Sequence, residues 1–309
     1  METKKPRWSV IRIVVWLTFG FFAYIAMTKI MPPLVNLALN PKIAPVCSTF
    51  QAVYGLHTHI AAFQAAPDIR RRSALLKKDS KGFDLWDTPQ GKYWVPRRTD
   101  DALWLLLGQE QQDIYDEGEA TVKPGDVVLD CGAHIGVFTR VALKRGAKIV
   151  VAIEPAPENL ECLRRNFSEE IRAGRVIVYP KGVWNKDDVL PMHTDRNSAG
   201  DSFVLDLDSG QKTINLPLTT IDEAVSELRL PRVDFIKMDI KGAEVEALQG
   251  ARRTLASFQP RMSIASEHFE TDPETIPKTV MEANPHYRLT CGSCYVRNGV
   301  TRPEILHFF

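Results

Sequence analysis

The chain has 309 residues, enough to bury the core of a full α/β domain and still add an N-terminal appendage. A hydrophobic fraction of 44% and a charged fraction of 25% exclude a disordered or fibrous protein. The net charge of +1 gives no reason to expect nucleic acid as a partner. The charge is uneven, however, because residues 1–100 contain 15 Lys and Arg against 6 Asp and Glu. A basic region of this kind favours an anionic membrane surface.

The N-terminus contains an apolar run. Ile13–Thr28 is 16 uncharged residues long and follows four basic residues. This is short for a spanning helix, which needs about 20 apolar residues, although Val10 and Ile11 extend it. The run also has no suitable signal-peptide cleavage site. We therefore predict a membrane anchor helix in residues 1–30, with membrane contact through residues 10–30.

The basic flank predicts a cytoplasmic N-terminus. A single span would export the rest of the chain, but Ile43–Pro67 has no charged residue and Arg70–Arg72 follows it. A second dip into the membrane, or an interfacial helix, would return the chain to the same side. His57 and His59 favour the interfacial helix. We expect a membrane-associated protein with its catalytic domain on the cytoplasmic side, and the topology stays open between a single span, a hairpin and a monotopic arrangement.

Residues 31–100 are predicted to be a linker or interfacial segment that ends in a β-hairpin. Pro and Gly interrupt residues 31–96, and no clear helical period is visible there. Phe83–Pro96 has two aromatic-rich arms around a Thr-Pro-Gln-Gly turn, which predicts the hairpin. Trp86, Tyr93 and Trp94 could stack on a sugar, or they could pack in the core.

Residues 101–309 alternate between strand and helix patterns, which predicts one α/β domain with a mostly parallel sheet and helices on both faces. The expected strands are Asp126–Cys131, Lys148–Ile153, Val176–Tyr179, Val233–Met238 and Met262–Ser266, with Tyr287–Cys291 and Glu304–Phe309 as a closing antiparallel pair. The expected helices are Leu103–Tyr115, His134–Arg145, Pro157–Ile171, Gly242–Phe258 and Pro273–Ala283. Val189–Leu218 is expected to insert extra short strands.

The five cysteines are odd in number and follow no disulfide framework. Reduced thiols in a cytosolic domain are the simpler interpretation. Cys291 and Cys294 have CxxC spacing, but no second pair accompanies them, so they are weak evidence for a metal or redox site. We expect no metal.

A glycine loop follows the first predicted strand of the domain. Asp130, Gly132 and Gly136 form the pattern D-x-G-x-x-x-G at the edge where open α/β sheets bind ligands. Gly132 allows a close backbone approach that a Cβ would block. The leading acidic residue would repel a phosphate, but it suits S-adenosylmethionine, which has an amino group, a sulfonium and no phosphate.

Glu154 ends the second predicted strand, 24 residues after Asp130. A carboxylate at this position can accept hydrogen bonds from both ribose hydroxyls. An NAD-dependent dehydrogenase is the alternative, and the missing second glycine of its fingerprint argues against it.

Asp239 follows the fourth predicted strand, at the same edge of the sheet. It could simply cap the next helix, or it could act in catalysis. Methyl transfer to a hydroxyl benefits from a general base. Asp239 and His193 are the candidates, with His268 behind them.

Four motifs in this order resemble the FkbM family of methyltransferases: Asp130–Phe138, Ile153–Asn159, Thr219–Asp222 and Asp234–Glu244. The resemblance covers roughly residues 101–309. It implies the seven-stranded, Rossmann-like class I methyltransferase fold, S-adenosylmethionine as cofactor, and O-methylation of a small-molecule hydroxyl. The cofactor residues expected from the motifs are Asp130, Gly132, His134, Gly136, Glu154, Pro155, Asn159 and Asp239.

Two residues depart from the family pattern. The family usually has Asn at the position of His134 and Glu at the position of Lys241. We therefore weigh two functions. The first is a membrane-tethered methyltransferase that acts on a hydroxyl of a sugar, glycan or other small molecule. The second is a catalytically silent S-adenosylmethionine-binding or scaffold protein at the membrane.

Overall fold

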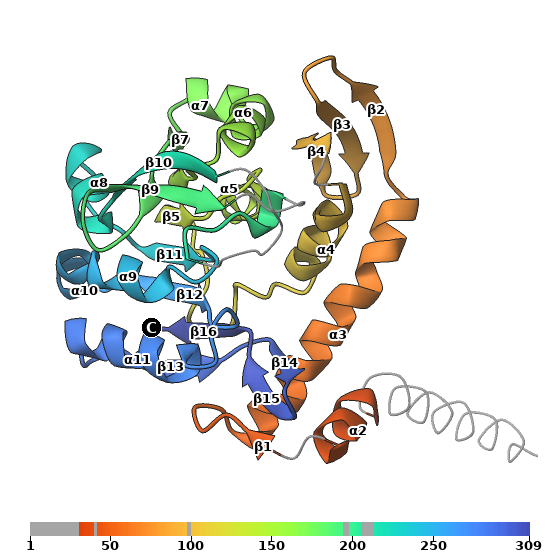
Figure 1. Ribbon diagram of the computed structural model, residues 1–309, viewed down its shortest axis with the longest axis vertical. Helices are drawn as coiled ribbons and strands as arrows, with labels where there is room; N and C mark the ends of the chain where they lie inside the picture. Colours follow the sequence, from red (N-terminus) through yellow and green to blue (C-terminus); the bar gives the residue numbers. More distant parts are fainter. Residues whose placement is uncertain (1–30, 40–41, 98–99, 194–197, 205–212) are drawn as a thin grey trace, which may run out of the picture.

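The computed structural model describes residues 31–39, 42–97, 100–193, 198–204 and 213–309 (Figure 1). The predicted anchor in residues 1–30 lies outside these ranges. Within them, no helix is both long enough and apolar enough to cross a membrane. The assignment of residues 1–30, 31–100 and 101–309 to three units stays a prediction.

A seven-stranded sheet forms the centre of the molecule (Figure 1). Its strands, in spatial order, are β13 (Leu289–Cys291), β16 (Ile305–Phe308), β12 (Arg261–Ala265), β11 (Phe235–Met238), β5 (Val127–Cys131), β6 (Ile149–Ile153) and β7 (Val176–Tyr179). The five strands from β12 to β7 are parallel, and β16 runs antiparallel to both of its neighbours. This arrangement confirms the class I methyltransferase fold and the predicted closing pair.

Helices cover both faces of this sheet. Val127 and Leu129 of β5 face a core shared with α8 (Ile221–Glu227), α9 (Glu244–Gln249), α10 (Arg252–Phe258) and α11 (Asp272–Ala283). Val128 faces the other way, against α5 (Val137–Lys144) and the segment after α4 (Asp100–Gln111). Alternate strand residues point to opposite faces, so both faces need apolar residues.

Two predicted helices are each divided in two. The stretch predicted as Gly242–Phe258 forms α9 and α10, which meet at Gly250, where a Cβ would overlap the carbonyl oxygen of Trp184. The stretch predicted as Pro157–Ile171 forms α6 (Pro157–Asn166) and α7 (Ser168–Arg172). Contacts with distant segments decide these breaks, and the local helical period does not show them.

The predicted insertion forms a small separate sheet. Its strands are β8 (Gly182–Val183), β9 (Asp188–His193) and β10 (Thr213–Thr219), in the order β8-β10-β9. Between β9 and β10, Ser198–Gly200 forms a short 3-10 turn, and Ser202 forms an antiparallel bridge with His193. The expectation of extra strands in this region is confirmed.

The N-terminal arm consists of α2 (Met31–Leu39), β1 (Lys42–Ile43) and α3 (Thr49–Arg71). Figure 1 shows α3 beginning beside β14 (Cys294–Arg297) and β15 (Val300–Pro303) and running past α4. The 23-residue helix α3 has no clear period because apolar side chains lie on both of its faces: Leu56 is buried, whereas Phe50 and Tyr54 are exposed. A helix therefore forms in the uncharged stretch for which the sequence favours an interfacial helix, although no helical period is visible there.

The predicted hairpin is confirmed as β3 (Phe83–Thr88) and β4 (Gly91–Pro96), and β2 (Ala74–Lys78) adds a third strand. Tyr93 is 1% exposed, and the ring of Trp86 packs edge-on against Trp104 with their centroids 5.0 Å apart. The aromatic residues of the hairpin pack against the domain, so core packing is the correct alternative.

A disulfide joins Cys47 to Cys291, 244 residues apart in the chain, and fastens the start of α3 to β13. The expectation of reduced thiols was wrong for these two residues, because the fold brings distant cysteines together in a way that spacing cannot show. Cys131, Cys162 and Cys294 are buried free thiols. Cys291 therefore pairs with Cys47 and not with Cys294, its neighbour in the CxxC motif.

Candidate functional site

A cavity that opens to solvent lies at the carboxyl ends of β5, β6 and β11. Its lining combines apolar side chains with a few polar and charged ones, as is usual for small-molecule sites. Six of the eight predicted cofactor residues line it: Gly132, His134, Glu154, Pro155, Asn159 and Asp239. The structure therefore brings together at one edge most of the side chains that the motifs indicated, and it places Asp130 and Gly136 behind them.

The two glycines shape the loop between β5 and α5. Both have positive φ angles, +75° at Gly132 and +91° at Gly136. A Cβ at Gly132 would overlap the carbonyl oxygen of Asp239, and one at Gly136 would overlap the ring of Phe167. Only glycine allows both the backbone conformation and these close approaches.

Asp130 is fully buried beneath the loop and does not line the cavity. Its Oδ2 accepts a hydrogen bond of 2.6 Å from the hydroxyl of Thr139, and its Oδ1 lies 3.4 Å from Nζ of Lys237. Lys237 also donates to the carbonyl of Gly132 at 2.9 Å. Asp130 thus holds the loop, α5 and β11 together, and direct contact between Asp130 and the cofactor stays a prediction that this geometry does not favour.

Glu154 is 6% exposed and faces the cavity from the end of β6. Its Oε2 accepts from the amide of His134 at 2.9 Å, and its Oε1 accepts from the amide of Ala156 at 2.8 Å. Burial raises the pKa of Glu154 to about 7. Oε1 also accepts from Nδ2 of Asn159 at 3.3 Å, so Oε2 is the oxygen that keeps a second lone pair for a ribose hydroxyl.

His134 has a φ of +51°, in the left-handed region. Asn, Asp and His are enriched in this region among residues other than glycine. The position therefore suits both His and the Asn that the family usually has. The contact to Glu154 uses the backbone amide of His134, which either residue supplies.

Asp239 is held on two sides. The hydroxyl of Tyr115 donates to its Oδ2 at 2.9 Å, and Nζ of Lys241 donates to its Oδ1 at 2.7 Å. Burial by itself would raise the pKa of this carboxyl, but the positive charges of Lys241, Lys237 and, to a lesser extent, His268 hold it well below its usual range. Asp239 is therefore ionised at neutral pH and is a weak base.

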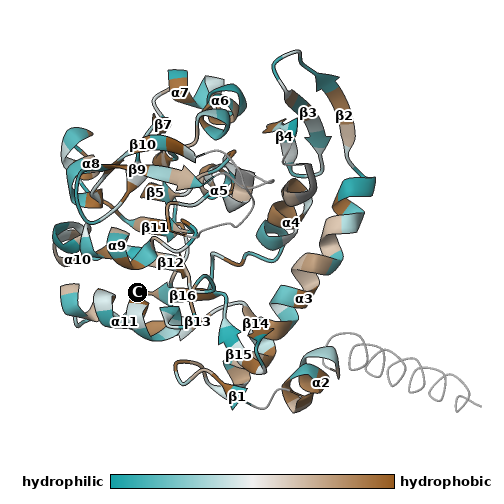
Figure 2. Cartoon of the chain, viewed as in Figure 1, coloured by the Kyte–Doolittle hydropathy of each residue, from teal (hydrophilic) through white to brown (hydrophobic). Residues whose placement is uncertain are grey.

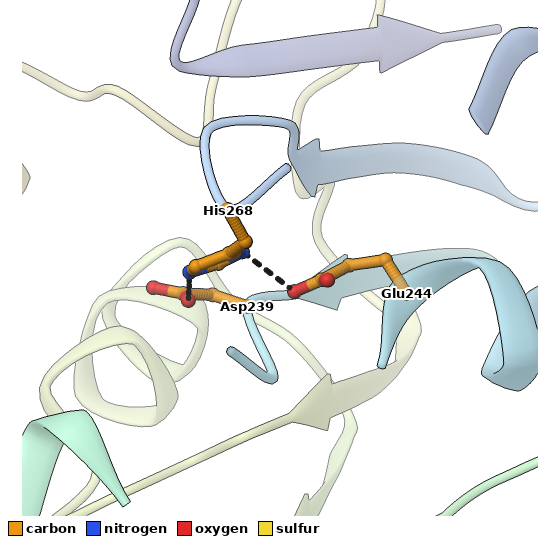
Figure 3. Close-up of side chains that lie close together, drawn as sticks. All are labelled: Asp239, Glu244 and His268. Atoms are coloured by element: carbon orange, nitrogen blue, oxygen red, sulfur yellow. Dashed lines mark ion pairs between the residues drawn. The ribbon is translucent and has the colours of Figure 1, made fainter. Parts of the chain in front are cut away.

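His268 lies between two carboxylates, as Figure 3 shows. Its Nδ1 is 3.2 Å from Oε1 of Glu244, and its Nε2 is 3.6 Å from Oδ1 of Asp239. Burial disfavours the charged imidazole, but the charges of Glu244 and Asp239 raise the pKa of His268 above its usual value. The ligand atoms of these three residues lie within 4.8 Å of one another.

The ligand atoms of Asp239, Glu244 and His268 are close enough together to bind a metal ion. The hydrogen-bond donors around them argue against this. The ammonium of Lys241 is already bonded to Asp239, and both oxygens of Glu244 accept from backbone amides, those of Ile240 at 2.8 Å and Gly242 at 2.9 Å. A cation would have to displace these donors. The cluster is better described as a network that fixes Asp239 beside the cavity.

The structure does not bring His193 to the cavity. Met192, its neighbour on β9, lines the cavity and is 2% exposed. Successive strand residues point to opposite faces, so His193 points away from the side that Met192 occupies. His193 as a general base stays a prediction that this geometry does not favour.

Three residues that the sequence analysis missed also line the cavity: Glu110, Tyr115 and Lys237. Lys237 could have been found from the sequence, because a lysine in the middle of a buried strand needs a partner. Glu110 and Tyr115 could not, because they reach the cavity only through the packing of α4 and the segment after it.

Comparisons with known proteins agree with this site. Residues 130–289 match the model of the methyltransferase FkbM domain. Over 194 residues the chain is 24% identical to hexuronic acid methyltransferase AglP of Haloferax volcanii, with 63% of this chain and 72% of AglP covered. A stretch of 56 residues is 46% identical to the 31-O-demethyl-FK506 methyltransferase FkbM of Streptomyces tacrolimicus, which covers 18% of this chain and 22% of that protein. A crystal structure of methyltransferase FkbM from Methylobacillus flagellatus KT aligns with a TM-score of 0.45 and 20% identity, over 84% of this chain and 62% of that one.

The family model covers more than half of the chain and includes the glycine loop, Glu154 and Asp239. The residues present also fit the cofactor, since Gly132 and Glu154 both line the cavity and Oε2 of Glu154 can accept a further hydrogen bond there. The predictions of an enzyme and of S-adenosylmethionine as its cofactor are confirmed. The chain belongs to the FkbM family of S-adenosylmethionine-dependent methyltransferases.

Proposed function

We propose that this methyltransferase acts on a hydroxyl of a sugar, glycan or other small molecule, and that it prefers an acceptor with a negative charge. The observation that supports this most directly is Lys241, which lines the cavity next to Asp239. An ammonium at this position attracts an anionic acceptor, whereas the Glu that the family usually has would repel one. The names of two relatives, a hexuronic acid methyltransferase and a 31-O-demethyl-FK506 methyltransferase, agree with a sugar or other small molecule as acceptor, and the first also agrees with an acidic one.

When bound, S-adenosylmethionine supplies the reaction with a methyl group on a good sulfonium leaving group. The protein contributes position and charge. Asp239, fixed by Tyr115 and Lys241, can accept a hydrogen bond from an acceptor hydroxyl and orient it. Because the pKa of Asp239 is low, its main contribution is orientation, and the proton leaves the acceptor late in the reaction.

The test is a panel of matched acceptors, in which each neutral hexose is paired with its uronic acid. We expect S-adenosylhomocysteine to be released at least about tenfold faster with the acids, and Lys241→Met to remove this preference. Equal turnover of both members of each pair by the wild type would contradict the charge preference. Cofactor binding without turnover on any acceptor would favour the catalytically silent alternative.

We also propose that the protein associates with a membrane through residues 10–30 and α2. The first described helix exposes Met31, Leu34, Val35 and Leu39, and Leu39 is 75% exposed. Figure 2 shows this apolar character on α2, directly after the apolar run in the sequence. Flotation of the full chain with anionic vesicles tests the proposal, and Leu34→Asp with Leu39→Asp should weaken the association.

The cytoplasmic side stays our prediction for the catalytic domain, and the Cys47–Cys291 disulfide weighs against it because disulfides are rare in reducing compartments. Protease protection in intact cells distinguishes the two sides.

A further inference from the structure

The C-terminal turn of α4 closes one side of the cofactor cavity. Leu106, Gln109 and Glu110 line the cavity, and their spacing of three and four residues places them on one face of the helix. The side-chain amide of Gln109 donates to Oε1 of Glu304 at 2.9 Å, which fixes this turn to the C-terminal strands. The position of Glu110 is therefore set by the fold.

Glu110 differs from the other acidic side chains around the cavity. Its residue is only 8% exposed, yet its carboxyl accepts no hydrogen bond from any residue that the structure describes. Asp130, Glu154 and Asp239 each accept hydrogen bonds from protein donors. A carboxyl that lines a cavity and has no protein donor among the described residues is available to a ligand that supplies one.

Four charged groups act on Glu110. Burial raises the pKa of Glu110 to about 8, and the positive charges of Lys237 and Arg145 oppose the shift. The negative charges of Asp130 and Asp113 add to it. Without ligand, Glu110 is therefore mostly protonated at neutral pH, and a bound cation would displace its proton.

The cavity has two chemically different ends. Glu154 lies at the end of β6, where the ribose is expected, whereas Lys237 lies on β11, and β5 separates these two strands. Glu110 lines the same cavity and lies near enough to Lys237 for that positive charge to lower its pKa. The part of S-adenosylmethionine that lies away from its nucleoside is the amino acid, which has one ammonium and one carboxylate. A carboxyl and an ammonium of the protein match this zwitterion.

We propose that Glu110 binds the α-ammonium group of the methionine part of S-adenosylmethionine, while the ammonium of Lys237 faces the methionine carboxylate. Glu110 is thus a cofactor-binding residue contributed by α4, outside the glycine loop and outside the segment that matches the family model. The proposal rests on S-adenosylmethionine as the cofactor and does not depend on the acceptor.

Calorimetric binding to Glu110→Gln tests the proposal without any acceptor. Two probes are used: S-adenosylhomocysteine, and methylthioadenosine, which has the nucleoside and sulfur but no amino acid. We expect the variant to bind S-adenosylhomocysteine about 10- to 100-fold more weakly and methylthioadenosine within about twofold of the wild type. Glu119→Gln, the same change at an exposed residue that does not line the cavity, is the matched control and should leave both affinities nearly unchanged.

Proton release gives an independent readout. In buffers of different ionisation enthalpy near neutral pH, binding of S-adenosylhomocysteine should release more protons than binding of methylthioadenosine. The difference isolates Glu110, because both probes contact Glu154 equally. This difference should disappear in Glu110→Gln.

The proposal would be overturned if Glu110→Gln bound both probes equally more weakly, or if it bound S-adenosylhomocysteine as tightly as the wild type does. Thermal melting of each variant identifies misfolding, and Glu110→Asp, which keeps the charge on a shorter side chain, is expected to bind with intermediate affinity. If the wild type bound neither probe, the cofactor assignment itself would be wrong, and that outcome is distinct from failure of the acceptor panel.

Discussion

Nζ of Lys241 lies 2.7 Å from Oδ1 of Asp239, so a cation and a carboxylate form an ion pair at the rim of the cofactor cavity. The two residues are only two positions apart, and Lys241 has a φ of +55°. The left-handed turn folds the lysine back toward the end of β11. The pair links Asp239, which we propose orients the acceptor, to Lys241, which departs from the family pattern.

Lys241→Met should shift the acidic limb of the pH–rate profile. Lys241 contributes most among the charges that lower the pKa of Asp239, so its removal lets burial raise that pKa. Asp239 then becomes protonated at a higher pH, and the activity that needs its carboxylate is lost there. We expect the acidic limb of kcat/KM to move up by about one unit or more. Lys241→Arg keeps the charge and should keep the profile, and an unmoved limb in the Met variant would refute this link.

Glu154 should make the free protein less stable as the pH rises toward neutral. Its pKa is raised from 4.5 in the unfolded chain to about 7 in the folded one, so between these values the folded state binds the extra proton. The free energy of unfolding then falls with rising pH, by roughly 3 kcal/mol from this group. Glu154→Gln should flatten the dependence measured by urea unfolding between about pH 5 and about pH 8. The same change at Glu158, on the exposed side of α6, should not.

Gly132→Ala should abolish cofactor binding, because the new Cβ would overlap the carbonyl oxygen of Asp239. Gly174→Ala is the matched control: its φ of +68° imposes a similar strain, but no atom lies within 4 Å of the added Cβ. The control should lose only roughly 1 kcal/mol of stability and keep its affinity. Similar effects of the two substitutions on S-adenosylmethionine binding would mean that the close approach at Gly132 is unimportant.

His134→Asn should preserve cofactor affinity within about threefold, because Asn also adopts the left-handed conformation and supplies the same amide to Glu154. His134→Val should lose roughly 1–2 kcal/mol of stability, since a β-branched residue is strained there. Titration calorimetry and thermal melting measure both effects. A large loss of affinity in the Asn variant would show that the imidazole itself contacts the cofactor.

The disulfide predicts the number of free thiols. Denatured, unreduced protein should show three thiols out of five cysteines. Cys47→Ala should raise this number by one, because it frees Cys291, whereas Cys162→Ala should lower it by one. Loss of the link should cost about 2–4 kcal/mol of stability. Five thiols in the wild type would show that the bond does not form.

Several features were predictable because they are local. The strands β5, β6, β7 and β11 lie within about two residues of their predicted bounds, since each is a short apolar run between turn residues. The loop after β5 and Glu154 were also predictable, because a strand, a tight turn and a helix fix the geometry of a few consecutive residues. Asp239 was placed correctly at the cavity because parallel strands end at one edge.

Other features could not be predicted because they depend on the direction in which a side chain points. His193 is a candidate base by residue type, but it lies on β9, where a shift of one residue reverses the direction of the side chain. Asp130 has the predicted motif position and still turns beneath the loop, because Thr139 and Lys237 bind it there.

The class I sheet, the glycine loop, the carboxylate of Glu154 at the end of β6 and the family could all be predicted from the sequence, because each depends on short stretches whose spacing is visible in the chain. The side chains that complete the cavity could not be predicted without the fold. Tyr115 meets Asp239 across 124 residues, Cys47 meets Cys291 across 244, and Glu110 reaches the cofactor cavity through the packing of α4. Contacts over such separations leave no local pattern, because only the packing of whole helices and strands brings those residues together.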